Sequence, residues 1–184
     1  MPTDLTEHQQ EAFRQIYERL DDGSRYTSLR GYAGTGKTYL VGRLIDQFEA
    51  EDETVTACAP THKAAHVLDS KIGSRTVHTQ TLHSLLGLKL VPDHEGSYKL
   101  EPDDDRPELP EGVVIVDEAS MIGKEEWHFI EKTPFFVRWL FVGDPAQLPP
   151  VGEKGSPVFN ISGPMLEEVH RQGKKNPILR LATQ

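Results

Sequence analysis

Cysteine, long apolar runs and export signals are the features that this sequence lacks. Cys58 is the single cysteine among 184 residues, so no disulfide can form within the chain, as is typical of a reducing cytosol. Its place in the apolar run 55–59 indicates a small core residue rather than a nucleophile. No apolar stretch approaches membrane-spanning length, residues 1–4 show no signal-peptide pattern, and no His/Cys cluster has zinc spacing. We therefore expect one cytoplasmic domain without a membrane partner.

The balance of charge argues against one common class of surface. The chain has 20 basic and 29 acidic residues and a net charge of −9, which disfavours a broad face for nucleic acid. The acids are unevenly distributed, because residues 89–111 hold eight acidic and three basic side chains, a net −5. The rest of the chain carries only −4, so the composition still permits a local groove for a single strand.

A phosphate-binding loop is the most specific pattern in the chain. Residues 31–38, GYAGTGKT, fit G-x-x-x-x-G-K-[ST]. They lie between a short strand expected at 26–30 and an amphipathic helix expected at 39–45, which is the context that this motif requires. A glycine-rich turn with an incidental lysine is the alternative, and the flanking strand and helix disfavour it.

Each residue of the loop has a chemical role in this interpretation. Gly34, Thr35 and Gly36 would turn backbone N–H groups toward a phosphate chain, at the positive end of the following helix. Lys37 would reach the β- and γ-phosphates, and the Thr38 hydroxyl would bind Mg²⁺.

A second motif supports the nucleotide interpretation. Residues 113–116 are continuously apolar, as suits a strand buried on both faces of a parallel sheet. Asp117 and Glu118 follow, at the carboxyl end of the strand, where open α/β sheets hold ligands. Asp117 would hold Mg²⁺ through water, and Glu118 would orient and deprotonate the attacking water. An exposed strand end is the alternative, which the phosphate loop makes less favourable.

Strand and helix patterns alternate along the chain. Helices are expected at 6–20, 39–45, 61–70, 125–132 and from 164 to 170, and strands at 26–30, 54–59, 113–116 and 137–142. A hairpin with glycine near its turn is expected between 88–91 and 97–100, before a Pro/Asp-rich linker at 102–110. The alternation predicts an α/β fold, a parallel sheet flanked by helices, with a small inserted β-hairpin.

Three further segments lie near the ends of predicted strands. Loops at one edge of a sheet converge in space, so these segments can share one site, at 59–65, 81–86 and 143–150. Gln147, a neutral amide, would report on nucleotide state near a γ-phosphate. Taken singly, each segment is equally consistent with an ordinary loop.

Together, these motifs make the sequence resemble the superfamily 1 DNA helicases of the RecD/Dda/Pif type over nearly its whole length. Residues 31–38 match motif I, and 117–120 match motif II. The segments similar to motifs Q, Ia, Ib, III and IV are 5–9, 59–65, 81–86, 143–148 and 166–172. The resemblance implies a P-loop NTPase domain of RecA-like fold. It also implies ATP and Mg²⁺ as cofactors and 5′–3′ movement on single-stranded DNA.

The resemblance also implies roles for single residues. Gln9 would contact the adenine base, and Arg171 would reach the γ-phosphate and join Lys37, Glu118 and Gln147 as the catalytic set. Single-stranded DNA would contact Pro60, Thr61, His62, Lys63, Thr81 and His83, and Tyr98 would be the aromatic of a strand-separating pin. Thr61 as a helix cap and His83 as a core residue are the alternatives.

The same likeness divides the chain into parts. Residues 1–87 and 112–176 would form the RecA-like motor domain 1A, 88–111 the inserted pin subdomain 1B with its acidic linker, and 177–184 the start of a second motor domain. In these helicases the second domain carries motifs V and VI and completes the ATP site, so it is an expected partner. We expect very weak ATP hydrolysis and little unwinding by the chain alone. A stand-alone regulatory ATPase that does not act on DNA, and a DNA-binding module with inactive ATP motifs, are the alternatives.

Overall fold

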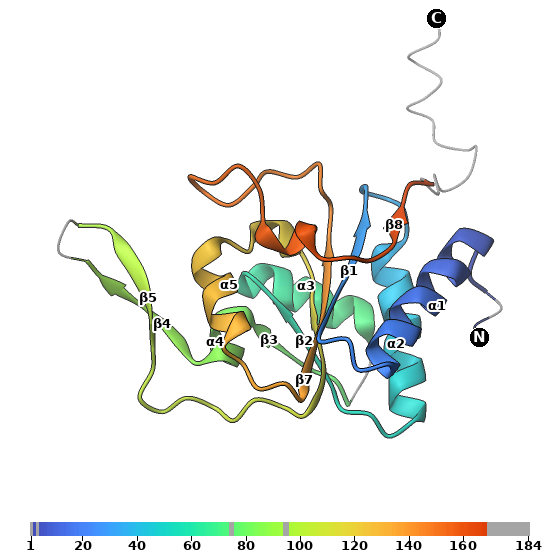
Figure 1. Ribbon diagram of the computed structural model, residues 1–184, viewed down its shortest axis with the longest axis horizontal. Helices are drawn as coiled ribbons and strands as arrows, with labels where there is room; N and C mark the ends of the chain where they lie inside the picture. The colour runs from blue at the N-terminus through green and yellow to red at the C-terminus, as the bar shows by residue number, and fades with distance from the viewer. Residues whose placement is uncertain (1, 3, 74–75, 94–95, 169–184) are drawn as a thin grey trace, which may run out of the picture.

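A parallel sheet of six strands forms the centre of the protein (Figure 1). The computed structural model describes residues 2, 4–73, 76–93 and 96–168. In this part of the chain the strand order is β3-β2-β6-β7-β1-β8, and every neighbouring pair is parallel. The predicted α/β class, a sheet flanked by helices with a small inserted hairpin, is confirmed.

Most predicted elements are present, with boundaries that differ by one or two residues at most ends, but the helix expected at 39–45 extends to residue 50. The strand at 78–81 and the short helix at 82–86 are not among the predicted elements. The helices are α1 (Glu7–Asp21), α2 (Lys37–Ala50), α3 (His62–Ile72), α4 (Leu82–Leu86) and α5 (Lys124–Glu131), with 3-10 turns η1 (Ala119–Met121) and η2 (Pro157–Asn160). The strands are β1 (Tyr26–Gly31), β2 (Val55–Ala59), β3 (His78–Thr81), β4 (Leu88–Pro92), β5 (Tyr98–Pro102), β6 (Gly112–Val116), β7 (Val137–Gly143) and β8 (Met165–Leu166). No helix in the described ranges is long and apolar enough to cross a membrane.

Both faces of the sheet are covered, which explains its continuously apolar strands. β2 and β6 are buried at every residue, and successive side chains point to opposite faces. Val113 and Ile115 therefore join the core cluster formed with α1, α2 and α3. Val114 and Val116 join the cluster formed with α4 and α5. Cys58 belongs to this second cluster, where burial raises the pKa of its thiol, so it is the core residue that the sequence predicts.

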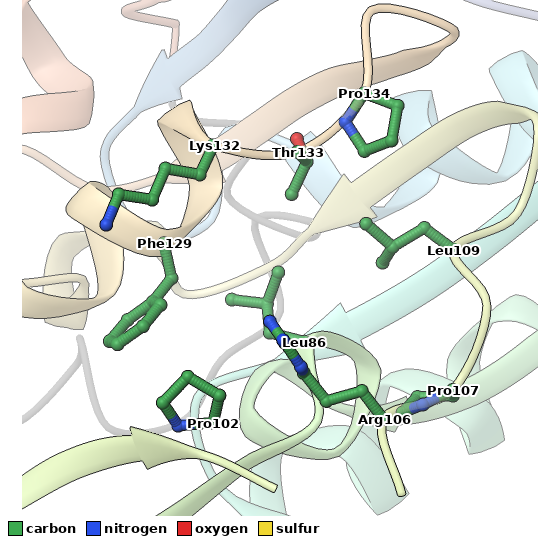
Figure 2. A pocket seen from close by; sticks show the side chains of 9 residues that line it. All are labelled: Leu86, Pro102, Arg106, Pro107, Leu109, Phe129, Lys132, Thr133 and Pro134. Carbon is green, nitrogen blue, oxygen red and sulfur yellow. The ribbon is translucent and has the colours of Figure 1, made fainter. Parts of the chain in front are cut away.

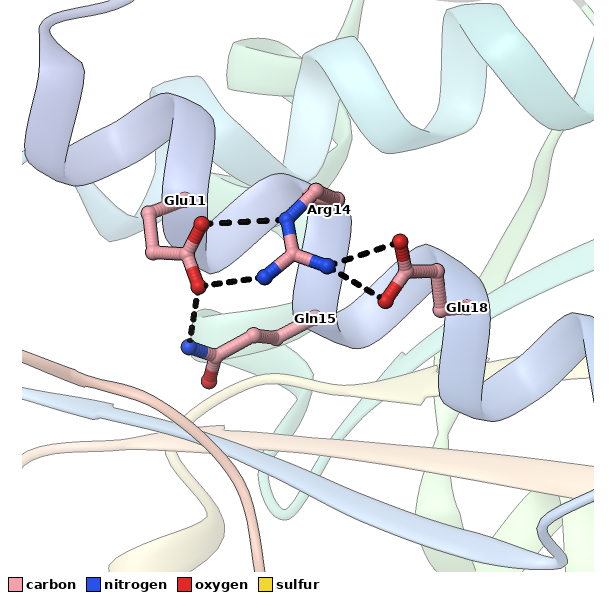
Figure 3. Close-up of polar contacts among 4 residues, drawn as sticks. All are labelled: Glu11, Arg14, Gln15 and Glu18. Carbon is pink, nitrogen blue, oxygen red and sulfur yellow. Dashed lines mark hydrogen bonds and ion pairs between the residues drawn. The ribbon is translucent and has the colours of Figure 1, made fainter.

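The first helix is capped by Thr6, whose side chain accepts from the Gln9 N–H, and it presents a charged face to solvent. Arg14 lies between Glu11 and Glu18, with N–O distances of 2.6 and 2.7 Å (Figure 3). Hydrogen bonds from Arg14 and Gln15 lower the pKa of Glu11 to about 2. Because water and salt screen these exposed groups, the buried face of α1 supplies most of its attachment to the sheet.

A two-stranded antiparallel hairpin projects from the sheet body (Figure 1). The register sorts its side chains by face. One face is apolar, with the pairs Leu88–Pro102, Leu90–Leu100 and Pro92–Tyr98. The other carries the pairs Lys89–Glu101 and Val91–Lys99. Leu90 and Tyr98 are 60% and 69% exposed, so the outer part of the apolar face is open to solvent.

The last predicted helix is wrong. The pattern from 164 to 170 predicts a helix, whereas Met165 and Leu166 form the edge strand β8 beside β1. Pairing with a strand distant in sequence overrides the local preference. The approach is close, because a Cβ at Gly31 would lie 2.9 Å from the Leu166 carbonyl oxygen. Residues 169–184, which include Arg171 and the segment 177–184, lie outside the described residues.

Candidate nucleotide site and single-strand surface

The phosphate loop closes directly onto the start of α2. Gly34 and Gly36 have φ values of 81° and 85°, in the left-handed region that glycine adopts without strain. α2 begins at Lys37, and Gly36, its N-cap, makes no side-chain bond to the N–H groups of the first turn. These donors and the positive end of the helix dipole suit an anion.

The buried side chains of Thr35 and Gln9 are hydrogen-bonded to backbone carbonyls of the phosphate loop. The Thr35 hydroxyl donates to the Tyr32 carbonyl at 2.8 Å. Gln9 Nε2 donates to the Thr35 carbonyl at 3.3 Å, and Gln9 Oε1 accepts from the Thr6 backbone N–H at 3.2 Å. A Cβ at Gly36 would lie 2.4 Å from Gln9 Nε2, so the start of α1 packs against the loop. Both amide atoms of Gln9, the residue predicted to contact adenine, are thus bonded within the fold.

Lys37 is hydrogen-bonded to backbone carbonyls and is influenced by the charges of two carboxylates. Its ammonium donates to the carbonyls of Gly31 at 2.7 Å and Tyr32 at 3.0 Å. Burial lowers the pKa of Lys37, and the negative charges of Asp144 and Asp117 oppose that shift. A cation in this position can leave two neutral carbonyls for the stronger attraction of a phosphate.

The acidic pair lies where the sequence predicts, at the carboxyl end of β6. Burial raises the pKa of Asp117, while the Glu118 N–H, Lys71 and Lys37 oppose the rise. The Asp117 carboxylate accepts from that N–H at 2.9 Å. Glu118 has a φ of 54°, a left-handed conformation that is rare outside glycine. The strained turn directs the chain into η1 and leaves Glu118 exposed.

The donor set suits a magnesium ion. Thr38 lies in the first turn of α2 and supplies a hydroxyl, and Asp117 supplies one carboxylate. No group of three or more His, Cys, Asp or Glu side chains in the described residues could enclose a metal. Magnesium needs no such cage, because it keeps several waters and takes one or two protein ligands beside phosphate oxygens.

Gln147 is held beside the acidic pair. Its Oε1 accepts from the Ser120 hydroxyl at 2.9 Å, which links the loop after β7 to η1, the turn directly after Glu118. The Gln147 backbone N–H donates to the Asp144 carbonyl at 3.1 Å. The predicted sensor thus lies in one hydrogen-bonded unit with the end of β6.

The first predicted DNA segment follows β2. Thr61 is the N-cap of α3, and its hydroxyl accepts from the Ala64 N–H at 3.1 Å. Pro60 is half-buried, whereas His62 and Lys63 are exposed on the first turn of α3. Thr61 therefore has the capping role that the sequence left open, beside two side chains that face solvent.

The second predicted DNA segment follows β3, the neighbour of β2. Thr81 is buried and caps α4, accepting from the Ser84 N–H at 3.1 Å. His83 is half-buried, with Nε2 3.3 Å from Glu126 Oε1. The two segments converge at one edge because β2 and β3 are parallel neighbours. Tyr98 lies apart from them, exposed on β5 of the hairpin.

Comparisons with known proteins agree with this arrangement. A family described as an AAA domain, AAA_30, matches residues 4–184. The chain belongs to this family. It is a motor domain of the superfamily 1B helicases of the RecD/Dda/Pif type.

The relatives of this motor domain are considerably longer. It is 37% identical over 165 residues to the ATP-dependent RecD2 DNA helicase of Deinococcus radiodurans, covering 87% of this chain and 21% of that protein. It is 30% identical over 151 residues to the ATP-dependent DNA helicase dda of Enterobacteria phage T4, covering 80% and 33%. A solved structure of Pif1 helicases at forked double-stranded DNA has a TM-score of 0.64 and 25% identity, covering 93% and 45%. The motor domain thus spans less than half of each of these relatives.

Two cavities of the motor domain differ in their relation to the site. One, of about 940 Å³, lies between the η1–α5 segment and the loop after β7 and is lined by Glu118 and Gln147. Four glutamates and no lysine or arginine line it, so it does not favour phosphate. The other, of about 380 Å³, lies between the linker and α5, beside Arg106, Leu109 and Phe129 (Figure 2). It contains none of the predicted site residues.

Asp144 is the residue that the sequence-based assignment missed. It is buried directly after β7, and its carboxylate accepts from the Ala146 N–H at 2.9 Å. β7 lies between β6 and β1, so the carboxyl end of β7 is beside both Asp117 and the phosphate loop. The sequence predicts that the segment 143–150 lies at this edge, but only the strand order shows that Asp144 lies beside both Asp117 and the phosphate loop.

Proposed function

We propose that the motor domain binds ATP or ADP with Mg²⁺, hydrolyses ATP and contacts single-stranded DNA, as the motor of a 5′–3′ DNA helicase. The observation that carries the proposal is the position of Lys37. It lies at the start of α2, between the carbonyls of Gly31 and Tyr32, and is attracted by Asp117 and Asp144. A cation at a helix N-terminus, within the electrostatic influence of two carboxylates, suits a phosphate chain and its metal.

Each residue at this edge has a defined part in the proposal. Gly34, Thr35 and Gly36 present backbone N–H groups to the phosphates, and Lys37 turns from its carbonyls to the β/γ oxygens. Thr38 and Asp117 hold Mg²⁺, which neutralises charge on the phosphates when it is bound.

In this proposal the catalytic residues are those that surround the γ-phosphate. Glu118, exposed at the end of β6, orients and deprotonates the water. Gln147 reports the nucleotide state to η1 through Ser120. Arg171 approaches the γ-phosphate in this proposal, and Gln9 contacts the adenine base after releasing one of its bonds.

Single-stranded DNA crosses the ends of β2 and β3 in this proposal. Pro60, Thr61, His62, Lys63, Thr81 and His83 offer backbone N–H groups, imidazoles and one ammonium. These groups suit phosphate contacts that carry no sequence information. Because few cations take part, affinity should be low, with a salt slope of about −0.7 per phosphate neutralised. Tyr98 on the hairpin stacks on a base.

A second RecA-like motor domain is the partner that the proposal requires. In this proposal residues 1–87 and 112–176 belong to domain 1A, 88–111 are the pin subdomain 1B, and 177–184 are the start of the second motor domain. An arginine supplied by a partner can raise the rate of phosphoryl transfer by about 10³–10⁵. We therefore expect very slow ATP turnover by the 184 residues alone, which Glu118→Gln abolishes. Many turnovers per second with single-stranded DNA would contradict the proposed need for a second motor domain.

A regulatory ATPase that does not act on DNA is the second candidate. It is favoured because two residues predicted to bind DNA already have partners within the protein. Thr81 is buried and caps α4, and His83 contacts Glu126. Both side chains would have to leave these partners to contact DNA fully.

Filter binding of labelled single-stranded DNA, with and without an ATP analogue and Mg²⁺, separates these functions. The helicase proposal predicts retention of DNA that responds to nucleotide and loses this response in Lys37→Ala. Lys63→Ala should make the salt slope shallower by about 0.7, whereas Lys154→Ala, an exposed lysine on the loop after β7, should not. Nucleotide binding without DNA retention would favour the regulatory ATPase, and DNA retention indifferent to nucleotide would favour a DNA-binding module.

A further inference from the structure

The described residues of the hairpin, 88–93 and 96–102, meet the body mainly near their ends. A two-stranded hairpin is at best marginally stable alone, so its orientation depends on contacts at its base. There, the Asp103 N–H donates to the Gly87 carbonyl at 2.7 Å, and Leu88 packs against the second core cluster. The ion pairs Lys99–Glu101 and Lys89–Asp103 stay within the hairpin and its linker.

In the described part of the chain, a hydrogen bond joins the middle of β5 to helix α5. The Leu100 N–H donates to Glu125 Oε1 at 2.6 Å. β5 has β4 on one side only, and alternate N–H groups of such an edge strand point away from the ladder. Glu125 receives one of these outward donors, and Leu100 is itself 6% exposed, against 60% for its cross-strand partner Leu90. The hairpin is therefore held to α5 at this point.

The helix turn that carries Glu125 is tied to the nucleotide edge. Glu126 Oε2 accepts from the Gly123 N–H at 3.0 Å, and Glu153 Oε1 accepts from the Lys124 N–H at 2.8 Å. Glu153 belongs to the same loop as Gln147. The Ser156 hydroxyl donates to the carbonyls of Ala119 and Ile122 at 3.0 and 2.7 Å, which fixes η1 between Glu118 and α5.

We propose that Glu125 is a positioning residue that holds the β4–β5 hairpin to the first turn of α5, so that the hairpin moves with the segment carrying Asp117 and Glu118. The connection is continuous. The chain runs from the acidic pair through η1 to Gly123 and into the first turn of α5, where the Glu125 carboxylate is hydrogen-bonded to the backbone N–H of Leu100. The anchor itself is independent of the function proposed above. Its use to couple the hairpin to nucleotide rests on that function.

Amide hydrogen exchange of Leu100 tests the anchor without any ligand. In Glu125→Ala, exchange should accelerate about tenfold, as expected for loss of a hydrogen bond to a charged acceptor. Glu125→Gln keeps an acceptor oxygen and should stay near the parent rate, as should Glu131→Ala at the other end of α5. An unchanged Leu100 rate in Glu125→Ala, or equal acceleration in Glu125→Gln, would overturn the proposal. So would acceleration that extends equally to Val114, because that would assign Glu125 to general stability.

A distance measurement tests the coupling. Spin labels are attached at Ser97→Cys on the hairpin and Ser70→Cys on α3, in a Cys58→Ala background. The distance between them measures the position of the hairpin relative to the body. ADP–Mg²⁺ should shift this distance in the parent and not in Glu125→Ala, with Glu125→Gln restoring the shift. No shift in the parent, or the same shift in Glu125→Ala, overturns the coupling. A parallel thermal melt shows whether ADP–Mg²⁺ binds at all, so failure of the proposed function is recognised separately.

Discussion

The parallel sheet and the β4–β5 hairpin use the same apolar residue types in opposite environments. Leu140 in β7 is fully buried between two layers of helices, whereas Leu90 in β4 is 60% exposed. Side chains of the sheet body are fixed from all sides, so they can place catalytic groups at its carboxyl edge. Among the described residues, the hairpin is attached to the body at its base and through Glu125. The sheet body therefore suits the precise placement of chemical groups, whereas the hairpin has fewer contacts to hold its orientation.

Matched leucine deletions should give the largest contrast between the two regions. Leu140→Ala removes a side chain that is 0% exposed and should lower the free energy of unfolding by about 2–5 kcal/mol. Leu90→Ala removes mostly exposed surface and should change it by about 0.5 kcal/mol or less. Urea titration of both variants measures the difference. Equal destabilisation would show that the hairpin belongs to the same cooperative core as the sheet.

Removal of the loop cation should abolish the response of the sheet body to nucleotide. ADP–Mg²⁺ at about 100 times its dissociation constant should stabilise the parent by roughly 2.7 kcal/mol. Lys37→Ala should lose this stabilisation, because the ammonium beside the loop is gone, while Lys99→Ala on the hairpin should keep it. Thermal melts with and without ADP–Mg²⁺ give the comparison. An increase in melting temperature with ADP–Mg²⁺ that is retained in Lys37→Ala would contradict nucleotide binding through Lys37 at the phosphate loop.

What the sequence predicts follows the same division. The phosphate loop at 31–38 and the buried strand before Asp117 are predictable, because a local motif and a continuous apolar run determine them. β8 is not, since its two residues become a strand only through pairing with Arg30 and Gly31. The bonds of His83 to Glu126 and of Leu100 to Glu125 join segments far apart in sequence. Such tertiary contacts leave no local pattern.

Substitution of two glycines, one at the base of the hairpin and one at its tip, compares how closely these two ends are packed. Gly87 has a φ of 60°, and a Cβ there would lie 2.5 Å from Arg106 Cγ and 2.8 Å from Pro107 Cδ in the linker. Gly96, with a φ of 79°, has no atom within 4 Å of such a Cβ. Gly87→Ala should therefore destabilise by about 2 kcal/mol or more, and Gly96→Ala by about 1 kcal/mol, the backbone term alone. Chemical denaturation measures the free energy of unfolding of both variants. A larger loss of stability in Gly96→Ala than in Gly87→Ala would contradict the conclusion that the hairpin is anchored at its base.

The pH dependence of Asp117 should give the smallest effect. Burial raises its folded pKa above 3.8, so the folded state binds the proton more tightly than the unfolded state. Its contribution to stability is therefore best below pH 3.8 and declines as the pH rises through the folded pKa. Asp117→Asn should gain stability relative to the parent across this window. Melts of both proteins at several pH values between 4 and 7 measure it, and a constant or declining difference would contradict the burial of this carboxyl.

The Lys37 side-chain resonance tests the central claim, that Lys37 receives the phosphates at the carboxyl edge of the sheet. In the chain labelled with ¹³C at lysine Cε, and with Lys37→Arg used for assignment, ADP–Mg²⁺ should move the Lys37 signal as the ammonium leaves the carbonyls of Gly31 and Tyr32. Lys99, on the hairpin, should stay in place. Saturable binding of ADP–Mg²⁺ with an unmoved Lys37 signal would contradict the account.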